Sequence, residues 1–301
     1  MALDRRTLLG SLAAAAALRP ALAQHAPPLT RPIPATGEAL PVVGLGTWIT
    51  FNVGEDEVAR DACAEVMGAF FEAGGRMIDS SPMYGSSQAV IGYGLRKLGE
   101  TGGLFSADKV WISSGRRGPA QIETSRELWG IPRFDLLQIH NLLAWEEHLP
   151  TLLAMKAEGR LRYVGITTSE GRRHEELEQV LRSQPLDFVQ LTYNPVDREA
   201  EERLLPLARD RGIAVIVNRP FQQGWLTQGL ADHPLPPWAA EIGCTSWAQL
   251  ILKFIVSHPA VTCAIPATTR VDHVRENMAA AGDPLPDPAM RARIAAHIEE
   301  L

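Results

Sequence analysis

The sequence predicts an α/β fold, a (β/α)8 TIM barrel, from one pattern that repeats along most of its 301 residues. Eight short apolar or β-branched runs alternate with amphipathic helical segments. Strands that alternate with helices form a parallel sheet, and eight such units close it. No second domain is evident. We therefore expect polar residues at the carboxyl ends of the strands to meet at one face, where the loops of such barrels build sites.

The N-terminal segment predicts an export signal, residues 1–23. Arg5 and Arg6 precede two leucines and an apolar run to Leu18, and Ala21-Leu-Ala23 has the small residues that signal peptidase accepts. The run is shorter than the ~20 residues that span a bilayer. The paired arginines resemble a twin-arginine signal, an address read by the export machinery. We expect a periplasmic protein that does not stay in the membrane, with ordinary Sec export as the alternative.

Composition and net charge disfavour several classes of protein, among them disulfide-rich, zinc-binding and nucleic-acid-binding proteins. Hydrophobic residues make up 46% of the chain and charged residues 21%, as in soluble globular proteins. Three widely spaced cysteines, Cys63, Cys244 and Cys263, give neither a disulfide framework nor zinc-ligand spacing. The net charge of −6 becomes −8 without residues 1–23, which hold three arginines and one aspartate. This acidic balance disfavours nucleic acids and anionic membranes as partners, and no metal site is predicted.

The elements follow in order. Residues 24–38 contain four prolines and predict a linker with a small hairpin cap, and residues 39–301 form the barrel. Strands are expected near Val42–Gly46, Arg76–Ile78, Leu104–Lys109, Leu136–His140, Tyr163–Ile166, Phe188–Leu191, Ala214–Asn218 and Thr262–Ile265. Helices are expected near Asp56–Ala73, Ser87–Leu98, Ala120–Leu128, Glu146–Glu158, His174–Arg182, Glu199–Arg211, Ser246–Val256 and Val271–Ala280. Asp232–Pro237 predicts an insertion after the seventh strand, and Pro286–Leu301 an extra outer helix.

The stretch after the second predicted strand carries the main functional signal. Met77-Ile78 leads into Asp79, and a turn with Pro82 then presents Tyr84 before a helix begins. An Ile-Asp strand end followed five positions later by Tyr-Gly resembles the signature of the aldo-keto reductases, which reduce carbonyls with a nicotinamide cofactor. On the residues alone, Asp79 as a turn cap and Tyr84 as a loop aromatic remain the alternative.

The resemblance implies a catalytic tetrad of Asp79, Tyr84, Lys109 and His140. A tyrosine, with a reference pKa of ~10, donates a proton near neutral pH when its anion is stabilised. An ammonium does this and a carboxylate holds the ammonium in place. An imidazole orients the carbonyl oxygen. His140 ends the run Asp135–His140, where a histidine satisfied within its strand is the alternative.

Which residue occupies the position of the tetrad lysine depends on the register of the third predicted strand. Leu104–Trp111 fits the family pattern without a gap and makes Lys109 the tetrad lysine, with Asp108 where threonine is common. The competing register takes Val110–Ser113, which is more β-prone, and puts Gly115 in the lysine position. The gapless fit of the downstream segment to similar exported members favours Lys109.

The resemblance also implies a nucleotide across the mouth of the barrel, although neither the family nor this chain has the Gly-rich Rossmann fingerprint. It assigns Gly46 and Thr47 to the first-strand contact, where a tight turn explains the glycine equally well. Thr167 and Thr168 stand where Ser-Asn is usual, and Gln190 matches the glutamine that holds the nicotinamide carboxamide.

Two further motifs depart from the family pattern. Asn218 and Arg219 end the seventh strand, where an aromatic residue normally stacks on the nicotinamide, and Asn218 cannot do so.

The last motif is Ile265–Arg270 followed by Glu276 and Asn277, which resembles the cradle of the adenosine phosphate. A guanidinium at Arg270 suits a 2′-phosphate, so NADPH is the expected cofactor and NADH the alternative. Ala267 and His273 occupy positions where lysine and arginine are frequent, and a merely solvated Arg270 remains open.

The pocket above Tyr84 is expected to include Trp48, Trp111 and Asn141, with Met83 and Trp225 near them, which indicates an apolar or aromatic aldehyde or ketone. Loop packing is the alternative for these aromatics. The resulting hypothesis is an NAD(P)H-dependent reductase of a small carbonyl compound. Two rivals remain: an exported nucleotide-binding sensor or interaction module with little catalysis, and a cofactor-independent lyase or isomerase.

Overall fold

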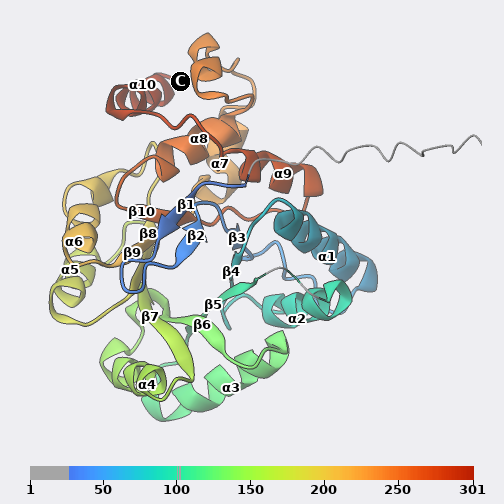
Figure 1. Ribbon diagram of the computed structural model, residues 1–301, viewed down its shortest axis with the longest axis vertical. Helices are drawn as coiled ribbons and strands as arrows, with labels where there is room; N and C mark the ends of the chain where they lie inside the picture. Colours follow the sequence, from blue (N-terminus) through green and yellow to red (C-terminus); the bar gives the residue numbers. More distant parts are fainter. Residues whose placement is uncertain (1–26, 100, 102) are drawn as a thin grey trace, which may run out of the picture.

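The computed structural model describes residues 27–99, 101 and 103–301. The predicted signal peptide lies outside the described residues. In Figure 1 the helices surround a ring of strands, and the blue β1–β2 hairpin lies across it.

Eight parallel strands form one sheet whose order follows the sequence, from β3 to β10. The sheet closes where backbone N–H groups of Gly44 and Gly46 donate to Ala264 O (2.8 Å) and Pro266 O (2.9 Å). A Cβ on Gly46 would lie 2.6 Å from Ile265 O, so only glycine allows this approach. The predicted (β/α)8 barrel is confirmed. Its strands are β3 (Leu45–Gly46), β4 (Met77–Asp79), β5 (Phe105–Val110), β6 (Phe134–Ile139), β7 (Leu161–Thr167), β8 (Phe188–Thr192), β9 (Ala214–Asn218) and β10 (Val261–Ala264).

Helices pack around the outside of the sheet. They are α1 (Glu57–Glu72), α2 (Ser87–Leu98), α3 (Gly118–Trp129), α4 (Trp145–Ala157), α5 (His174–Ser183), α6 (Leu204–Asp210), α7 (Trp225–Gly229), α8 (Trp247–Val256), α9 (Val271–Ala279) and α10 (Pro288–Glu299). α10 is the predicted extra helix. The insertion after β9 is longer than expected, because it holds α7 and a 3-10 turn, η5 (Pro237–Ile242), besides the proline-rich piece.

Two element predictions were wrong in extent. The first barrel strand is only two residues long, and the helix expected over Glu199–Arg211 is divided into η3 (Glu199–Glu201) and α6. Pro206 explains the division. It has no N–H to donate to the carbonyl of Glu202, four residues earlier, and its ring crowds that carbonyl, which disfavours a helix that continues from η3 into α6.

The hairpin of β1 (Thr30–Pro32) and β2 (Ala39–Pro41) plugs the amino-terminal end of the barrel. Its Ile33 and Leu40 are fully buried in a cluster with apolar residues of the barrel interior, among them Phe105. The Glu38 carboxylate pairs with Arg76, which precedes β4, and with Arg162 of β7. The plug leaves the opposite, carboxyl-terminal end of the barrel open for a site.

Candidate active site

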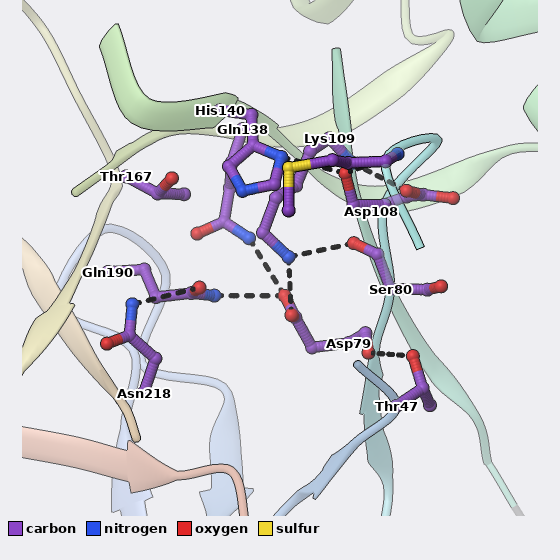
Figure 2. A network of polar contacts seen from close by, with 12 residues as sticks. Thr47, Asp79, Ser80, Asp108, Lys109, Gln138, His140, Thr167, Gln190 and Asn218 are labelled. Carbon is purple, nitrogen blue, oxygen red and sulfur yellow. Dashed lines mark hydrogen bonds and ion pairs between the residues drawn. The ribbon is translucent and has the colours of Figure 1, made fainter. Parts of the chain in front are cut away.

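A buried ion pair stands at the carboxyl end of β4 and β5 (Figure 2). Lys109 Nζ lies 2.5 Å from Asp79 Oδ1 and donates to the backbone oxygen of Ser80 at 2.8 Å. The two side chains are 0% and 2% exposed. Because β5 covers Phe105–Val110, the strand register that contains Lys109 is confirmed and the competing register is wrong.

Two glutamines hold the other oxygen of Asp79. Its Oδ2 accepts from Gln138 Nε2 (3.1 Å) and Gln190 Nε2 (2.9 Å), so both carboxylate oxygens are engaged. Gln138 was not among the predicted site residues. Its signal was available, since Gln138 lies two positions before His140 and residues two apart on a strand share a face.

Tyr84 and Lys109 interact electrostatically. Lys109 Nζ lies 5.1 Å from the centroid of the Tyr84 ring. Burial raises the pKa of Tyr84, and the ammonium of Lys109 opposes that rise. Burial lowers the pKa of Lys109, but Asp79, with smaller contributions from Tyr84 and Asp108, outweighs this effect, so the pKa of Lys109 lies above its usual value. The phenol therefore keeps its proton at neutral pH beside a charged ammonium.

His140 directly follows β6, and the hydroxyl of Ser81 contacts one nitrogen of its ring. Its Nδ1 lies 2.8 Å from Ser81 Oγ, and its ring meets the Tyr84 ring nearly edge-on, with the centroids 5.8 Å apart. Burial and then the charge of Lys109 lower the pKa of His140 to about 3. The imidazole is thus neutral across the physiological pH range.

These groups face a cavity of about 820 Å³ at the mouth of the barrel. Most of the predicted site residues line it: Gly46, Thr47, Trp48, Asp79, Tyr84, His140, Asn141, Thr167, Gln190, Asn218, Arg219, Glu276 and Asn277. Lys109 lies behind Asp79, and Thr168 is buried beside the cavity. Trp111 is 41% exposed at the rim, with its ring centroid 6.5 Å from that of His140. Met83 lines the cavity, whereas Trp225 is 72% exposed.

The side-chain amide of Asn218 is fixed in one orientation. Its Oδ1 accepts from Thr192 Oγ1 (2.7 Å), and its Nδ2 donates to Thr168 O (2.9 Å). Gln190 Oε1 also accepts from Asn218 Nδ2, at 3.4 Å. Thr167 Oγ1 accepts from the backbone N–H of Asn141, at 3.0 Å. These bonds hold the Asn218 amide in place at the cavity, at the position where the family pattern has an aromatic ring.

The far end of the cavity carries mixed charge. Arg219 pairs with Glu170 at 2.8 Å, and this partner was not predicted because no local pattern in the sequence links the two residues. Arg270 lies outside the cavity lining and pairs with Asp272, both side chains being 62% exposed. In this structure the one arginine assigned to the adenosine phosphate is therefore engaged by a neighbouring carboxylate.

The described residues contain no group of three or more histidine, cysteine, aspartate or glutamate side chains placed to hold a metal ion. Across that same part of the chain, no helix combines the length and apolar character needed to cross a bilayer.

Known proteins similar to this chain show its family. The model of the Aldo/keto reductase family matches residues 42–299. The methylglyoxal reductase YeaE of Escherichia coli is 29% identical over 246 residues, 80% of this chain and 85% of that protein. The NADH-specific methylglyoxal reductase of the same organism is 25% identical, over 83% of this chain and 92% of its own. The aldo/keto reductase from Klebsiella pneumoniae, solved with NADP and acetate, superposes with a TM-score of 0.73 and 25% identity, over 87% of this chain and 93% of its own.

Proposed function

The chain belongs to the aldo/keto reductase family, and from that premise we propose that it reduces an aldehyde or ketone to an alcohol with NADPH, with Tyr84 as the general acid. The observation that carries the proposal is the buried Asp79–Lys109 pair beside the Tyr84 ring, with His140 on the same cavity. A nicotinamide cofactor held at this cavity by residues such as Gln190 and Thr168 would supply the hydride for the carbonyl carbon.

The four residues then handle the oxygen. Tyr84 gives its proton to the carbonyl oxygen as the negative charge develops there. The phenolate left behind is stabilised by the ammonium of Lys109, whose position Asp79 fixes through the 2.5 Å contact. His140, neutral, donates a hydrogen bond that holds the oxygen near Tyr84. Hydride and proton together convert the carbonyl to an alcohol.

The residues around the cavity fit a nicotinamide dinucleotide. Thr168 Oγ1 is buried without a hydrogen-bond partner among the described residues, which leaves it free to bond a carboxamide. We assign the nicotinamide end to Gly46, Thr47, Thr167, Thr168, Gln190 and Asn218. We assign the adenosine end to Arg270, Glu276 and Asn277, and a further cofactor contact to Arg219 beside Asn218.

The choice between NADPH and NADH depends on Arg270 in this proposal. Its guanidinium suits a 2′-phosphate, but Asp272 competes for it. The NADP-bound Klebsiella structure supports NADPH, and the NADH-specific relative keeps NADH as the alternative. We therefore expect a modest preference for NADPH.

The substrate end of the cavity is apolar. Trp48 and Met83 line it beside Tyr84, and Trp111 lies at its rim. We propose an apolar or aromatic aldehyde or ketone, with the small dicarbonyl methylglyoxal worth testing because two relatives are named for it.

We also propose that residues 1–23 are a twin-arginine signal and that the mature protein acts in the periplasm. Support comes from Arg5-Arg6 and the apolar run after them. Replacing both arginines with lysine should leave the protein in the cytoplasm. Continued export of that variant would favour the Sec route.

Calorimetric titration of the chain from Gln24 onward with NADPH and then NADH tests the function, followed by an assay of NADPH oxidation with a panel of aldehydes. Tight binding and turnover support the reductase. Tight binding without turnover of any carbonyl would favour the sensor, whose motivation is the changed residues Thr168 and Asn218. No nucleotide binding would favour a cofactor-independent lyase or isomerase.

A further inference from the structure

A buried serine lies directly behind the candidate catalytic histidine. Ser81, two residues after Asp79, is 0% exposed, and its Oγ lies 2.8 Å from His140 Nδ1. The same oxygen accepts the backbone N–H of Met83 at 3.2 Å. Among the described residues these two contacts are the only hydrogen bonds of the Ser81 hydroxyl.

The proton on that hydroxyl decides which nitrogen of His140 is protonated. A neutral imidazole carries one N–H, so its Nδ1 is either a donor or an acceptor. If Nδ1–H donated to Ser81, the serine O–H would need another acceptor, and the described residues offer none within its buried site. An unsatisfied buried donor is unfavourable. If Ser81 instead donates to Nδ1, every group at the contact is satisfied.

We propose that Ser81 is a positioning residue that fixes His140 as the Nε2–H tautomer, so that the imidazole presents a donor to the substrate oxygen. A carbonyl oxygen only accepts hydrogen bonds, and the opposite tautomer would place a bare nitrogen lone pair against it. This inference rests on the proposed carbonyl reduction for its consequence, but the tautomer itself does not depend on turnover.

The lowered pKa of His140 supports the argument. At a value of about 3 the ring is neutral in the working range, so the tautomer matters. A histidine charged at neutral pH would donate from both nitrogens and would need no neighbour to select one.

The direct test is nitrogen NMR of the protein labelled with 15N-histidine and saturated with NADP+, with His140 assigned from the His140→Gln spectrum. We expect Nε2 to resonate as a protonated nitrogen and Nδ1 as an unprotonated one. In Ser81→Ala the two forms should mix, and kcat/KM should fall about tenfold through kcat, with the Kd for NADPH unchanged. Ser81→Thr keeps the hydroxyl and should restore the wild-type tautomer.

Ser80 provides a matched control. It is equally buried, and its Oγ pairs with Ser87 Oγ at 2.9 Å, away from the imidazole. Ser80→Ala loses a comparable hydrogen bond and should leave the His140 resonances as in the wild type. Protonation of Nδ1 in the wild type, or an unchanged tautomer in Ser81→Ala, would overturn the proposal. An inactive protein that shows the expected tautomer would contradict the carbonyl reduction and leave the tautomer assignment standing.

Discussion

Each end of the barrel contains a carboxylate paired with cations from neighbouring strands, but the two environments differ. At the amino end Glu38 joins the plug to Arg76 and Arg162, with side-chain exposures of 20% to 32%. At the carboxyl end Asp79 and Lys109 are almost entirely excluded from water. Solvent screens the first network and not the second.

The difference in solvent exposure indicates whether each ion-pair network serves stability or catalysis. Partly exposed pairs contribute at most about 1 kcal/mol each, and the plug also has the buried Ile33 and Leu40 to hold it. A fully buried pair is weak evidence for stability, because apolar residues of the same shape often do as well. The Asp79–Lys109 pair is better explained by its effect on Tyr84 than by its effect on folding.

The largest effect is expected for Lys109→Met. It leaves the Asp79 charge buried without its partner, which should lower the free energy of unfolding by about 3–5 kcal/mol. Turnover should fall by a factor on the order of 10²–10⁴. Urea unfolding and steady-state kinetics measure the two. The double variant Asp79→Asn/Lys109→Met should regain most of the stability and none of the activity. Recovered activity in the double variant would contradict the role of the pair.

Tyr84→Phe should separate chemistry from folding at the same end. Removing one hydroxyl keeps the aromatic ring and its contacts with Lys109 and His140, so stability should change by less than about 1 kcal/mol. Turnover should fall by roughly 10²–10⁴ with the cofactor affinity nearly kept. Turnover equal to the wild type would eliminate Tyr84 as the acid.

Acid pH should lower the stability of the fold through the protonation of His140 in the unfolded chain. Its folded-state pKa of about 3 lies below the usual histidine pKa of 6.5. As the pH falls below that value the unfolded chain binds a proton and the folded chain does not, so His140 removes up to about 1.4 kcal/mol of stability per pH unit. kcat/KM should show no inflection from His140 between about pH 5 and pH 8. An inflection near 6.5 that disappears in His140→Gln would show that the imidazole titrates in the active enzyme.

The smallest effect is expected for Glu38→Gln at the amino end. Partial burial raises the pKa of Glu38, but the Tyr163 hydroxyl and Arg162 outweigh it and hold the pKa below its usual value. Solvent screening limits the loss to about 1 kcal/mol at neutral pH, and activity should stay at the wild-type level. Thermal unfolding and the carbonyl assay check both. A loss of activity would show that the plug and the site are coupled through the barrel.

Local signals in the sequence were enough for the architecture. Alternation of apolar runs and amphipathic segments predicts β9 and α2 at their observed bounds, and the adjacency of Asp79 and Tyr84 in one strand-end loop is a property of the chain itself. Pro206 disfavours a continuous helix over Glu199–Arg211 and was also visible in the sequence, but the predicted helix ran through it.

Contacts between distant strand ends depended on the tertiary structure. The closed barrel brings Gln138 and Gln190 to one oxygen of Asp79. It also places the Ser81 hydroxyl against His140 Nδ1 and pairs Arg219 with Glu170. Arg270 meets Asp272 in the adjoining first turn of α9, but only the folded backbone shows that Arg270 lies outside the cavity lining. Periodicity tells which face of an element is buried, because burial depends on local spacing. Which polar groups form hydrogen bonds with each other depends on how closure of the barrel places the strand ends. The distances between those ends cannot be inferred from any local sequence pattern.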